Sequence, residues 1–415
     1  MKRLINIVSR WNKDKLYRNS IYLMISSIIL TGFGFFFWTI NARLFSSHDV
    51  GIATTIISAM SLVATLSSLG LGIALIRFLP TSIEKNKHIN SSIVVVSIAG
   101  ITLATLFIMH LGWLSPKLLF IKKNLYYGIL FIIFVVLQAQ SNLIDQIFIA
   151  LRDTRFVVIK NTLFSIGKLV FPFFLVVFGA YGIFSSWGLS LFISIIAAMF
   201  FLAVKFRFKP RVVLYDSILK RIFRFSILNY IATILSQLPG LVLPLLITNY
   251  LTPIDTAYFY VTMMIATLIF IIPTSVANSL FAEGSYNQID LKKSIKKSVL
   301  LISMLLLPVI LLMIVFGRRL LLLFGAEYSN NGYWLLVILA VSAVPQAVRS
   351  VYSAILNVKK KIVHLIFLNL VVSFSIIALS VAFVHKGLFG IAIAWLLGQC
   401  TVFLALPLNF LRNKY

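Results

Sequence analysis

The sequence predicts an all-α protein that crosses a membrane about twelve times. Of its 415 residues, 60% are hydrophobic and only 11% are charged, whereas soluble domains carry about 25% charged residues. The apolar residues form blocks of about twenty, the length that a helix needs to cross a hydrocarbon core of about 30 Å. Backbone groups inside a bilayer must bond within their own segment, so we expect these blocks to be helices.

The predicted helices fall into two groups of six. Their expected positions are 20–41, 52–76, 92–114, 126–150, 157–178, 182–204, 225–250, 257–282, 298–316, 334–357, 362–384 and 388–411. Only three residues, Gly179 to Tyr181, separate the fifth helix from the sixth, so a tight turn is expected there.

The formal net charge of +27 would suggest a nucleic-acid partner in a soluble protein. In a membrane protein, basic residues instead keep loops on the cytoplasmic side, where they meet anionic lipid. No aromatic-basic RNA-binding motif and no Cys/His cluster is present, so neither nucleic acid nor a metal or other cofactor is predicted. The single cysteine, Cys400, excludes an internal disulfide framework.

The distribution of Lys and Arg predicts the topology. Of 37 such residues, 28 lie in segments that are inside if the N-terminus is cytoplasmic, and 7 lie in the segments outside. Lys160 is counted here with the cytoplasmic segment that also holds Arg152 and Arg155. Both termini are therefore predicted to be cytoplasmic, in a multi-pass protein of the plasma (inner) membrane.

The two groups of helices resemble each other at an offset of about 206 residues. Asn41–Asp49 corresponds to Ile247–Asp255, and each segment ends in an Asp that would cap the next helix. An even number of helices per group predicts parallel repeats, in which one half rocks against the other. The predicted domains are an N-terminal bundle at 1–204, a basic cytoplasmic linker at 205–224 and a C-terminal bundle at 225–415.

The linker is the longest and most basic of the segments predicted to be inside. Ile218, Ile222 and Phe225 are spaced as on one face of a helix. This spacing predicts a short amphipathic helix on the inner membrane surface.

Three ionisable residues stand out inside the predicted helices: Asp145, Lys168 and Arg349. Charged groups at membrane depth are costly, so they are candidates for a function in translocation. Each shares a helical face with other polar residues: Gln138, Ser141 and Asn142 for Asp145; Asn161 and Ser165 for Lys168; Gln346, Ser350, Ser353 and Asn357 for Arg349. The repeat places Asp145 over Ser350, beside Arg349.

Two interpretations of these charges stay open. They could line a hydrated cavity and meet an anionic head group or a coupling ion. They could instead pair with each other, Asp145 with Lys168 or Arg349, and hold the helices together. Three further candidates, Arg43, Arg77 and Glu283, stand near helix ends, where extension of the side chain to the interface also explains Arg77 and Glu283.

Two sequence stretches carry a resemblance to a known family. Asn41–Ala53 is similar to the signature after the first helix of polysaccharide-biosynthesis flippases, and Leu69–Pro80 resembles the end of their second helix. These flippases belong to the multidrug/oligosaccharidyl-lipid/polysaccharide exporter superfamily. The resemblance implies two six-helix bundles around a basic cavity, and Arg43 and Arg77 match arginines of the two motifs. Leu69 departs from the pattern, because many relatives have an acid there.

The family resemblance also implies a function. The expected substrate is an oligosaccharide on polyprenyl pyrophosphate, moved with the help of the membrane potential or of H⁺ or Na⁺ antiport. The chain lacks the two extra helices typical of the lipid II flippase, which favours an O-antigen type. The predicted partners are this lipid-linked oligosaccharide and membrane lipids, and no catalytic residue is predicted.

Two other functions are weighed against the flippase. A drug/cation antiporter would need acidic cavity residues, of which Asp145 is one candidate. A membrane-embedded glycosyltransferase or O-antigen polymerase would need catalytic acids or arginines on large outer loops. The outer loops here are short, and the longest, at about 115–125, contains no acid. The sequence contains no phosphate-binding loop, so direct use of ATP is not predicted.

Overall fold

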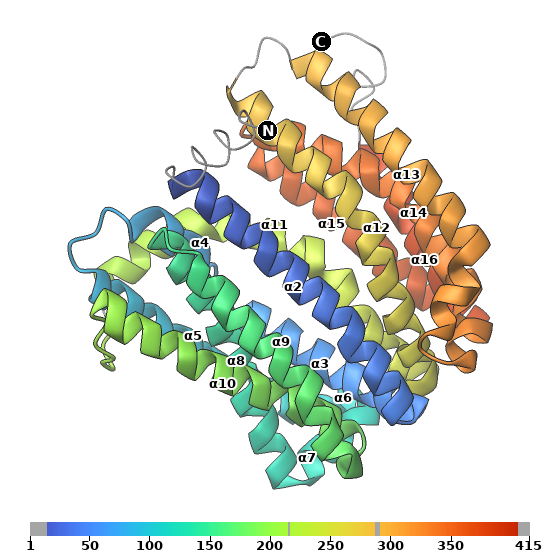
Figure 1. Cartoon of the computed structure of the whole chain (residues 1–415), viewed down its shortest axis with the longest axis horizontal. Helices are drawn as coiled ribbons and strands as arrows, with labels where there is room; N and C mark the ends of the chain where they lie inside the picture. The colour runs from blue at the N-terminus through green and yellow to red at the C-terminus, as the bar shows by residue number, and fades with distance from the viewer. Residues whose placement is uncertain (1–14, 215, 287–290, 406–415) are drawn as a thin grey trace, which may run out of the picture. The chain divides into compact units, whose positions relative to one another are not determined.

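The computed structural model describes residues 15–214, 216–286 and 291–405 (Figure 1). Throughout these residues the chain forms helices joined by short turns, and they contain no strand. Eleven helices among them are long and apolar enough to cross a membrane. The last of these spans, Ile362–Leu404, contains two main helices, Ile362–Phe383 and Gly387–Cys400, besides two short helical elements. Counting the two main helices separately gives the predicted twelve for the described residues. The prediction of an all-α, multi-pass membrane protein is confirmed.

The N-terminal half begins with a long helix and ends with another. Its helices are α2 (Lys15–Leu44), α3 (Ser47–Ser67), α4 (Leu71–Phe78), α5 (Lys85–Met109), α8 (Leu125–Ala150), α9 (Arg155–Leu175) and α10 (Ala180–Phe206). Short helical turns join them: α6 (Leu111–Leu114), η1 (Pro116–Leu118) and α7 (Leu119–Lys123) between α5 and α8, and η2 (Val176–Phe178) after α9.

The C-terminal half has the same order of helices, and its first four helices are longer than those of the N-terminal half. Its elements are α11 (Asp216–Tyr250), α12 (Pro253–Tyr286), α13 (Leu291–Leu322), α14 (Ala326–Val358), α15 (Ile362–Phe383), η3 (Val384–Lys386), α16 (Gly387–Cys400) and α17 (Val402–Ala405). In the predicted linker, α10 ends at Phe206 and α11 already begins at Asp216. The separate amphipathic helix is therefore a wrong prediction, because the backbone from 216 onward is continuous with a membrane helix. The side chains of Ile218, Ile222 and Phe225 lie outside the described residues.

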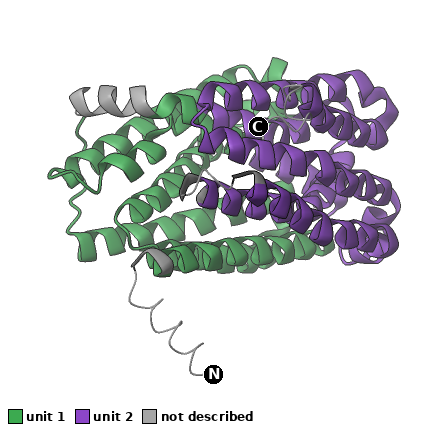
Figure 2. Ribbon diagram, turned by 90° about the horizontal axis from the view of Figure 1, so that it is seen from above, with its two compact units in different colours: residues 1–45, 59–230 green, residues 46–58, 231–415 purple. Residues whose placement is uncertain are grey.

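Packing divides the chain into two compact units (Figure 2). Unit 1 comprises residues 1–45 and 59–230, and unit 2 comprises residues 46–58 and 231–415. The start of α3 belongs to unit 2 because its small residues pack closely there. The Thr55 hydroxyl bonds to that of Thr248, which lies 2.7 Å from the hydroxyl of Thr256. The predicted bundle boundaries at 204 and 225 stay a prediction. Residues 46–58 pack in unit 2, although the prediction places them in the N-terminal bundle.

The predicted second helix, 52–76, is broken. Leu69 and Gly70 adopt positive φ angles of 47° and 73°, which separate α3 from α4. The Tyr230 hydroxyl lies 3.0 Å from the Thr65 carbonyl oxygen and 2.7 Å from that of Leu66. A helix end leaves carbonyl groups without partners, and this hydroxyl donates to them inside the unit.

The internal repeat is confirmed by local geometry. The Ser46 hydroxyl accepts a hydrogen bond from the backbone N–H of Asp49 at 3.1 Å, and Thr252 does the same for Asp255 at 3.1 Å. The hydroxyl residue, not the Asp, caps each helix, and each hydroxyl donates to the carboxylate at 2.6 Å. These caps stand 206 residues apart, as the sequence predicts.

The offset grows to 208 residues in the fourth to sixth helices. Arg152 and Lys360 end the fourth helices with φ of 54° and 55°, and Gly179 and Gly387 open the sixth with φ of 55° and 64°. With this offset Asp145 stands over Ser353, so its predicted placement over Ser350 is wrong. The correct offset allows each polar residue to be compared with its equivalent in the other half.

A glycine near the start of the sixth helix of each half packs against backbone, so we expect its replacement by alanine to destabilise both halves in the same way. A Cβ at Gly182 would lie 2.0 Å from the Leu175 carbonyl oxygen, and one at Gly390 would lie 2.0 Å from that of Phe383. We expect Gly182→Ala and Gly390→Ala each to destabilise the fold by about 1–3 kcal/mol, because a backbone atom must shift. Thermal unfolding in detergent would measure this loss.

Gly240→Ala is the matched control, because no atom lies within 4 Å of its Cβ position. An added methyl group in a helix there should leave the melting temperature unchanged or raise it. Equal stability of all three variants would contradict the close approach in the sixth helices.

Candidate functional site

Three charged residues inside unit 1, Asp145, Lys160 and Lys168, lie on two neighbouring helices, α8 and α9. Asp145 stands five residues before the end of α8 at Ala150, and Lys160 stands five residues after the start of α9 at Arg155. At a rise of about 1.5 Å per residue, both lie about 7–8 Å from the same turn. Equal distance from the turn of a helical hairpin brings the two side chains to one depth.

Asp145 and Lys160 form an ion pair. The Lys160 Nζ lies 2.9 Å from Oδ2 of Asp145, and the two side chains are 2% and 21% exposed, respectively. Lys160 also donates to Oγ of Ser141 at 2.7 Å and to its carbonyl oxygen at 3.1 Å. The assignment of Lys160 to a cytoplasmic segment is thus wrong, because α9 begins at Arg155 and carries it into the bundle. The ion-pair partner of Asp145 is therefore Lys160, and not Lys168 or Arg349 as the sequence suggested.

Lys168 lies two helical turns beyond Lys160 on α9 and is 3% exposed. Its Nζ is surrounded by aromatic rings, with centroids at 5.0 Å for Phe164, 5.2 Å for Trp187 and 5.7 Å for Phe37. Within the described residues no carboxylate lies within 4.0 Å of this ammonium group. Cation–π attraction to three rings compensates part of the lost hydration. We call Lys168, Phe37, Phe164 and Trp187 the lysine cage.

Hydrogen bonds hold the lysine cage in place and connect it to α8. The Trp187 indole N–H donates to Oε1 of Gln138 at 3.1 Å, and the Gln138 amide donates to Oδ1 of Asn142 at 3.2 Å. Asn142 is exposed. The polar face predicted on α8 therefore links the exposed Asn142 to the aromatic rings around the buried cation.

The C-terminal half has uncharged residues at the positions equivalent to the lysine cage and the ion pair. The cage residues Phe37, Phe164, Lys168 and Trp187 correspond to Leu243, Val372, Ile376 and Trp395, all of which belong to the hydrophobic core of unit 2. Asp145 and Lys160 likewise correspond to Ser353 and Leu368. The fold therefore accommodates isoleucine where Lys168 stands and does not need a charge for packing.

Other polar residues are shared by both halves and have a structural role. The Asn161 amide donates to Oγ of Ser26 at 2.8 Å, and Asn369 donates to the Ala232 carbonyl oxygen at 3.0 Å. Both bonds join the fifth helix of a half to its first. Because the two asparagines make equivalent bonds, the predicted face around Lys168 contains a packing contact as well as the buried cation.

Arg349 is the half-buried cation of unit 2, on α14. No carboxylate of the described residues lies within 4.0 Å of it. One turn away, Gln346 is 7% exposed, and its Oε1 has no hydrogen-bond partner in the described part of the chain. The repeat places Arg349 over Ser141, the residue that binds Lys160, and Gln346 over Gln138. Each unit thus carries a cation without a carboxylate partner among the described residues.

The three remaining candidates lie at helix ends. Arg43 is exposed at the end of α2, and Arg77 is exposed in the last turn of α4, with its guanidinium carbon 5.9 Å from the Phe78 ring centre. Glu283 is exposed near the end of α12. None of them belongs to the ion pair or to the lysine cage. Lys160 and Trp187 were missed by sequence reasoning, although the equal distances of Asp145 and Lys160 from the intervening turn could have revealed their pairing.

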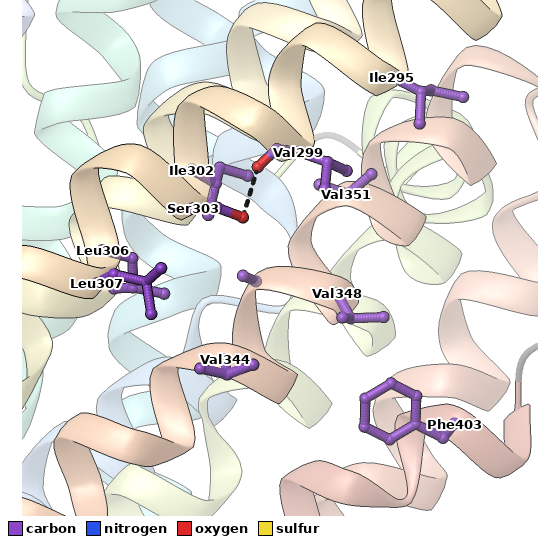
Figure 3. Close-up of a pocket in the computed structure, with 11 residues that line it drawn as sticks. Ile295, Val299, Ile302, Ser303, Leu306, Leu307, Val344, Val348, Val351 and Phe403 are labelled. Atoms are coloured by element: carbon purple, nitrogen blue, oxygen red, sulfur yellow. Dashed lines mark hydrogen bonds between the residues drawn. The ribbon is translucent and has the colours of Figure 1, made fainter. Parts of the chain in front are cut away.

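Unit 2 also contains an apolar pocket of about 340 Å³ that is lined by α13, by α14 and by Phe403 of α17 (Figure 3). Its one polar lining residue is Ser303, whose hydroxyl donates to the Val299 carbonyl oxygen at 3.0 Å. No candidate charged residue lines the pocket. The described residues also contain no group of His, Cys, Asp and Glu that could hold a metal ion. The charged groups on α8 and α9 are therefore the candidate site of unit 1, and Arg349 on α14 is the candidate of unit 2, each described by itself.

The chain can be compared with known proteins at two levels. A family model described as polysaccharide biosynthesis protein matches residues 40–332. No curated protein sequence matches the chain.

Solved structures share the fold at low sequence identity. An inward-facing multidrug resistance MATE family transporter of the MOP superfamily is 16% identical, with a TM-score of 0.73 over 95% of this chain and 98% of that one. The lipid II flippase MurJ, in an inward closed conformation, is 15% identical, with a TM-score of 0.71 over 95% and 88%. A MOP superfamily transporter from Pyrococcus furiosus, described as having a binding pocket of reverse polarity, is 16% identical, with a TM-score of 0.57 over 96% and 95%.

The second half of the repeat provides a test of the buried ion pair. Asp145→Ser alone should destabilise unit 1 by about 3–5 kcal/mol, because it leaves the Lys160 charge buried without its partner. The double variant Asp145→Ser, Lys160→Leu reproduces the Ser353 and Leu368 of the other half and should recover most of that stability. A double-mutant cycle of melting temperatures in detergent would measure the coupling. Additive losses would show that the pair does not act as a unit.

Proposed function

Because the chain belongs to the polysaccharide biosynthesis protein family, we propose that it is a flippase that moves oligosaccharide linked to polyprenyl pyrophosphate from the cytoplasmic to the outer leaflet. The observation that carries this proposal is Lys168. It is a buried cation among aromatic rings, at a position where the other half of the same chain has Ile376. A charge that packing does not require is a candidate for binding.

The chemistry of the site suits an anionic head group. The charge of Lys160 is balanced by Asp145, whereas Lys168 and Arg349 have no carboxylate partner among the described residues. Electrostatic attraction is stronger where water is excluded, so a pyrophosphate near such a cation would regain part of the hydration that it loses on leaving the surface. The exposed Asn142, bonded through Gln138 to Trp187, offers a polar approach to the cage.

The internal repeat supports transport by alternating access. Parallel repeats in transporters place the substrate site between the halves, and the halves rock around it. In this proposal the protein is a transporter and not an enzyme, and its partners are the lipid-linked oligosaccharide and membrane lipids. We place it in the plasma membrane with both termini cytoplasmic, on the bias of Lys and Arg. The membrane potential, H⁺ or Na⁺ would drive the cycle.

A drug/cation antiporter is the second candidate, and the structural likeness to a MATE transporter favours it. A cationic substrate would require a free acid in the site. Asp145, the acid predicted for this role, is bound to Lys160 at 2.9 Å. The described groups therefore favour an anionic substrate. A glycosyltransferase or polymerase fits less well, because the connection 110–124 between α5 and α8 contains no acid.

Reconstitution into vesicles that contain lipid-linked oligosaccharide tests the proposal. Lys168→Ile places the residue of the other half into the cage, so it should preserve insertion and folding while slowing flipping by about tenfold or more, equivalent to at least about 1.4 kcal/mol in the barrier. The measurement is the rate at which the glycan becomes accessible to an added glycosidase. Lys168→Arg, which keeps the charge, should retain more activity than Lys168→Ile.

A full rate of flipping in a well-folded Lys168→Ile variant would exclude the cation from the mechanism. Absence of flipping by the unaltered protein, together with efflux of a cationic dye, would favour the antiporter instead.

Arg349 provides a separate test in unit 2. Arg349→Ala should also lower the flipping rate without reducing insertion, because it removes the cation that has no carboxylate partner in the described residues. Normal activity in this variant would confine the binding charge to unit 1.

A further inference from the structure

The segment that follows α10, residues 207–214, is fixed to the start of α5. Asn90 makes two bonds to its backbone: the amide nitrogen donates to the Lys209 carbonyl oxygen at 2.9 Å, and Oδ1 accepts from the Arg211 N–H at 3.0 Å. Ser91 adds a bond to the Val213 carbonyl oxygen at 3.3 Å. We call residues 207–214 the linker segment. It is held in place on unit 1, although no helix or strand forms there.

The attachment buries only a small part of the linker segment. Asn90 is 6% exposed and Phe208 is 3% exposed, so these two side chains anchor it. The cationic side chains of Arg207, Lys209 and Arg211 are exposed. The anchored backbone therefore presents three positive charges within five residues at the surface of unit 1.

Apolar side chains stand exposed beside these charges. Val212 is 91% exposed, Leu214 is 55% exposed, and Ile83, in the turn before α5, is 100% exposed. The bond from the Asn86 amide to the Arg207 carbonyl oxygen, at 3.4 Å, places this turn beside the linker segment. A mixture of basic and exposed apolar side chains is typical of surfaces that enter the membrane interface.

The length of α10 predicts that the linker segment lies at the depth of the lipid head groups. α10 has 27 residues, so it is about 40 Å long, at about 1.5 Å per residue. A hydrocarbon core of about 30 Å leaves its end at Phe206 in the interfacial region. The adjacent Lys205 is bound to Asp153 in the turn between α8 and α9, so this turn lies at the same end of unit 1.

We propose that the linker segment and Ile83 form a docking site for anionic phospholipids of the adjacent leaflet. Arg207, Lys209 and Arg211 bind the lipid phosphates, while Val212, Leu214 and Ile83 enter between the head groups. An acidic protein surface would match the charges but would not explain three apolar side chains at interfacial depth. The site anchors unit 1 to the leaflet that the charge bias predicts to be cytoplasmic, and it does not depend on the proposed substrate.

Fluorescence in vesicles tests this site. Cys400 is the single cysteine of the chain, so Cys400→Ser with Val212→Cys allows one environment-sensitive dye to be attached in the linker segment. The full-length protein would be placed in vesicles of phosphatidylcholine alone or mixed with phosphatidylglycerol, with quencher groups near the lipid head groups. We expect blue-shifted emission and lipid quenching that are several-fold stronger in the phosphatidylglycerol vesicles.

Two triple variants on this background distinguish an effect of the linker segment from an effect of the protein's total positive charge. Arg207→Gln, Lys209→Gln, Arg211→Gln together should abolish the difference between the two vesicle types. Lys117→Gln, Lys122→Gln, Lys123→Gln remove three exposed cations from the connection between α5 and α8 and should leave it unchanged. Gel filtration would verify that both variants fold.

Three results would overturn the proposal. Equal lipid quenching in both vesicle types would exclude recognition of anionic lipid. Quenching by aqueous iodide without lipid quenching would show a surface that faces water or a soluble partner. Protection from both quenchers would show that protein covers the segment.

Discussion

The desolvation of charged side chains inside a bilayer governs both the fold and the candidate site of this protein. A buried ion is tolerated when hydrogen bonds and an opposite charge replace its water. Lys160 satisfies this condition with Asp145 and Ser141. Lys168 satisfies it only in part, because aromatic rings attract its charge without neutralising it. These two lysines lie eight residues apart on one helix, and they differ in that Lys160 has a carboxylate partner and Lys168 has none among the described residues. This difference is the reason why we propose Lys168, and not Lys160, as the group that meets a ligand.

Comparison of the two halves of the repeat separates residues of the shared packing from charges that only one half carries. Asn161 and Asn369 make equivalent bonds between the fifth and first helices of their halves, so they belong to the shared frame. Lys168 and Ile376 occupy equivalent positions but differ in charge. Since both halves have the same helix order, the isoleucine shows that the frame is complete without a cation there. The charges of Asp145, Lys160 and Lys168 therefore occur in one copy only, and that of Arg349 occurs only in the other.

The same physical constraint explains why much of the fold could be predicted. In lipid, backbone groups have no water to bond with, so long apolar blocks must form helices. Features that depend on contacts between helices were not predictable in this way. The break at Leu69 and Gly70 depends on the Tyr230 hydroxyl, which donates to carbonyl groups more than 160 residues away. The course of residues 207–214 depends on Asn90, whose amide could equally have capped a helix or faced solvent.

The sequence by itself determined the fold class, the number of membrane helices and the existence of the repeat, because these follow from apolar length and from self-similarity. It also identified Asp145, Lys168 and Arg349 as unusual, because charge at membrane depth is costly wherever it occurs. Only the tertiary structure decided which charges are paired. Pairing depends on the register of neighbouring helices, which assigned Lys160 to Asp145 and left Lys168 among Phe37, Phe164 and Trp187. A shift of one residue turns a helical side chain by about 100°, and such a shift would have changed the partners without changing the apolar pattern.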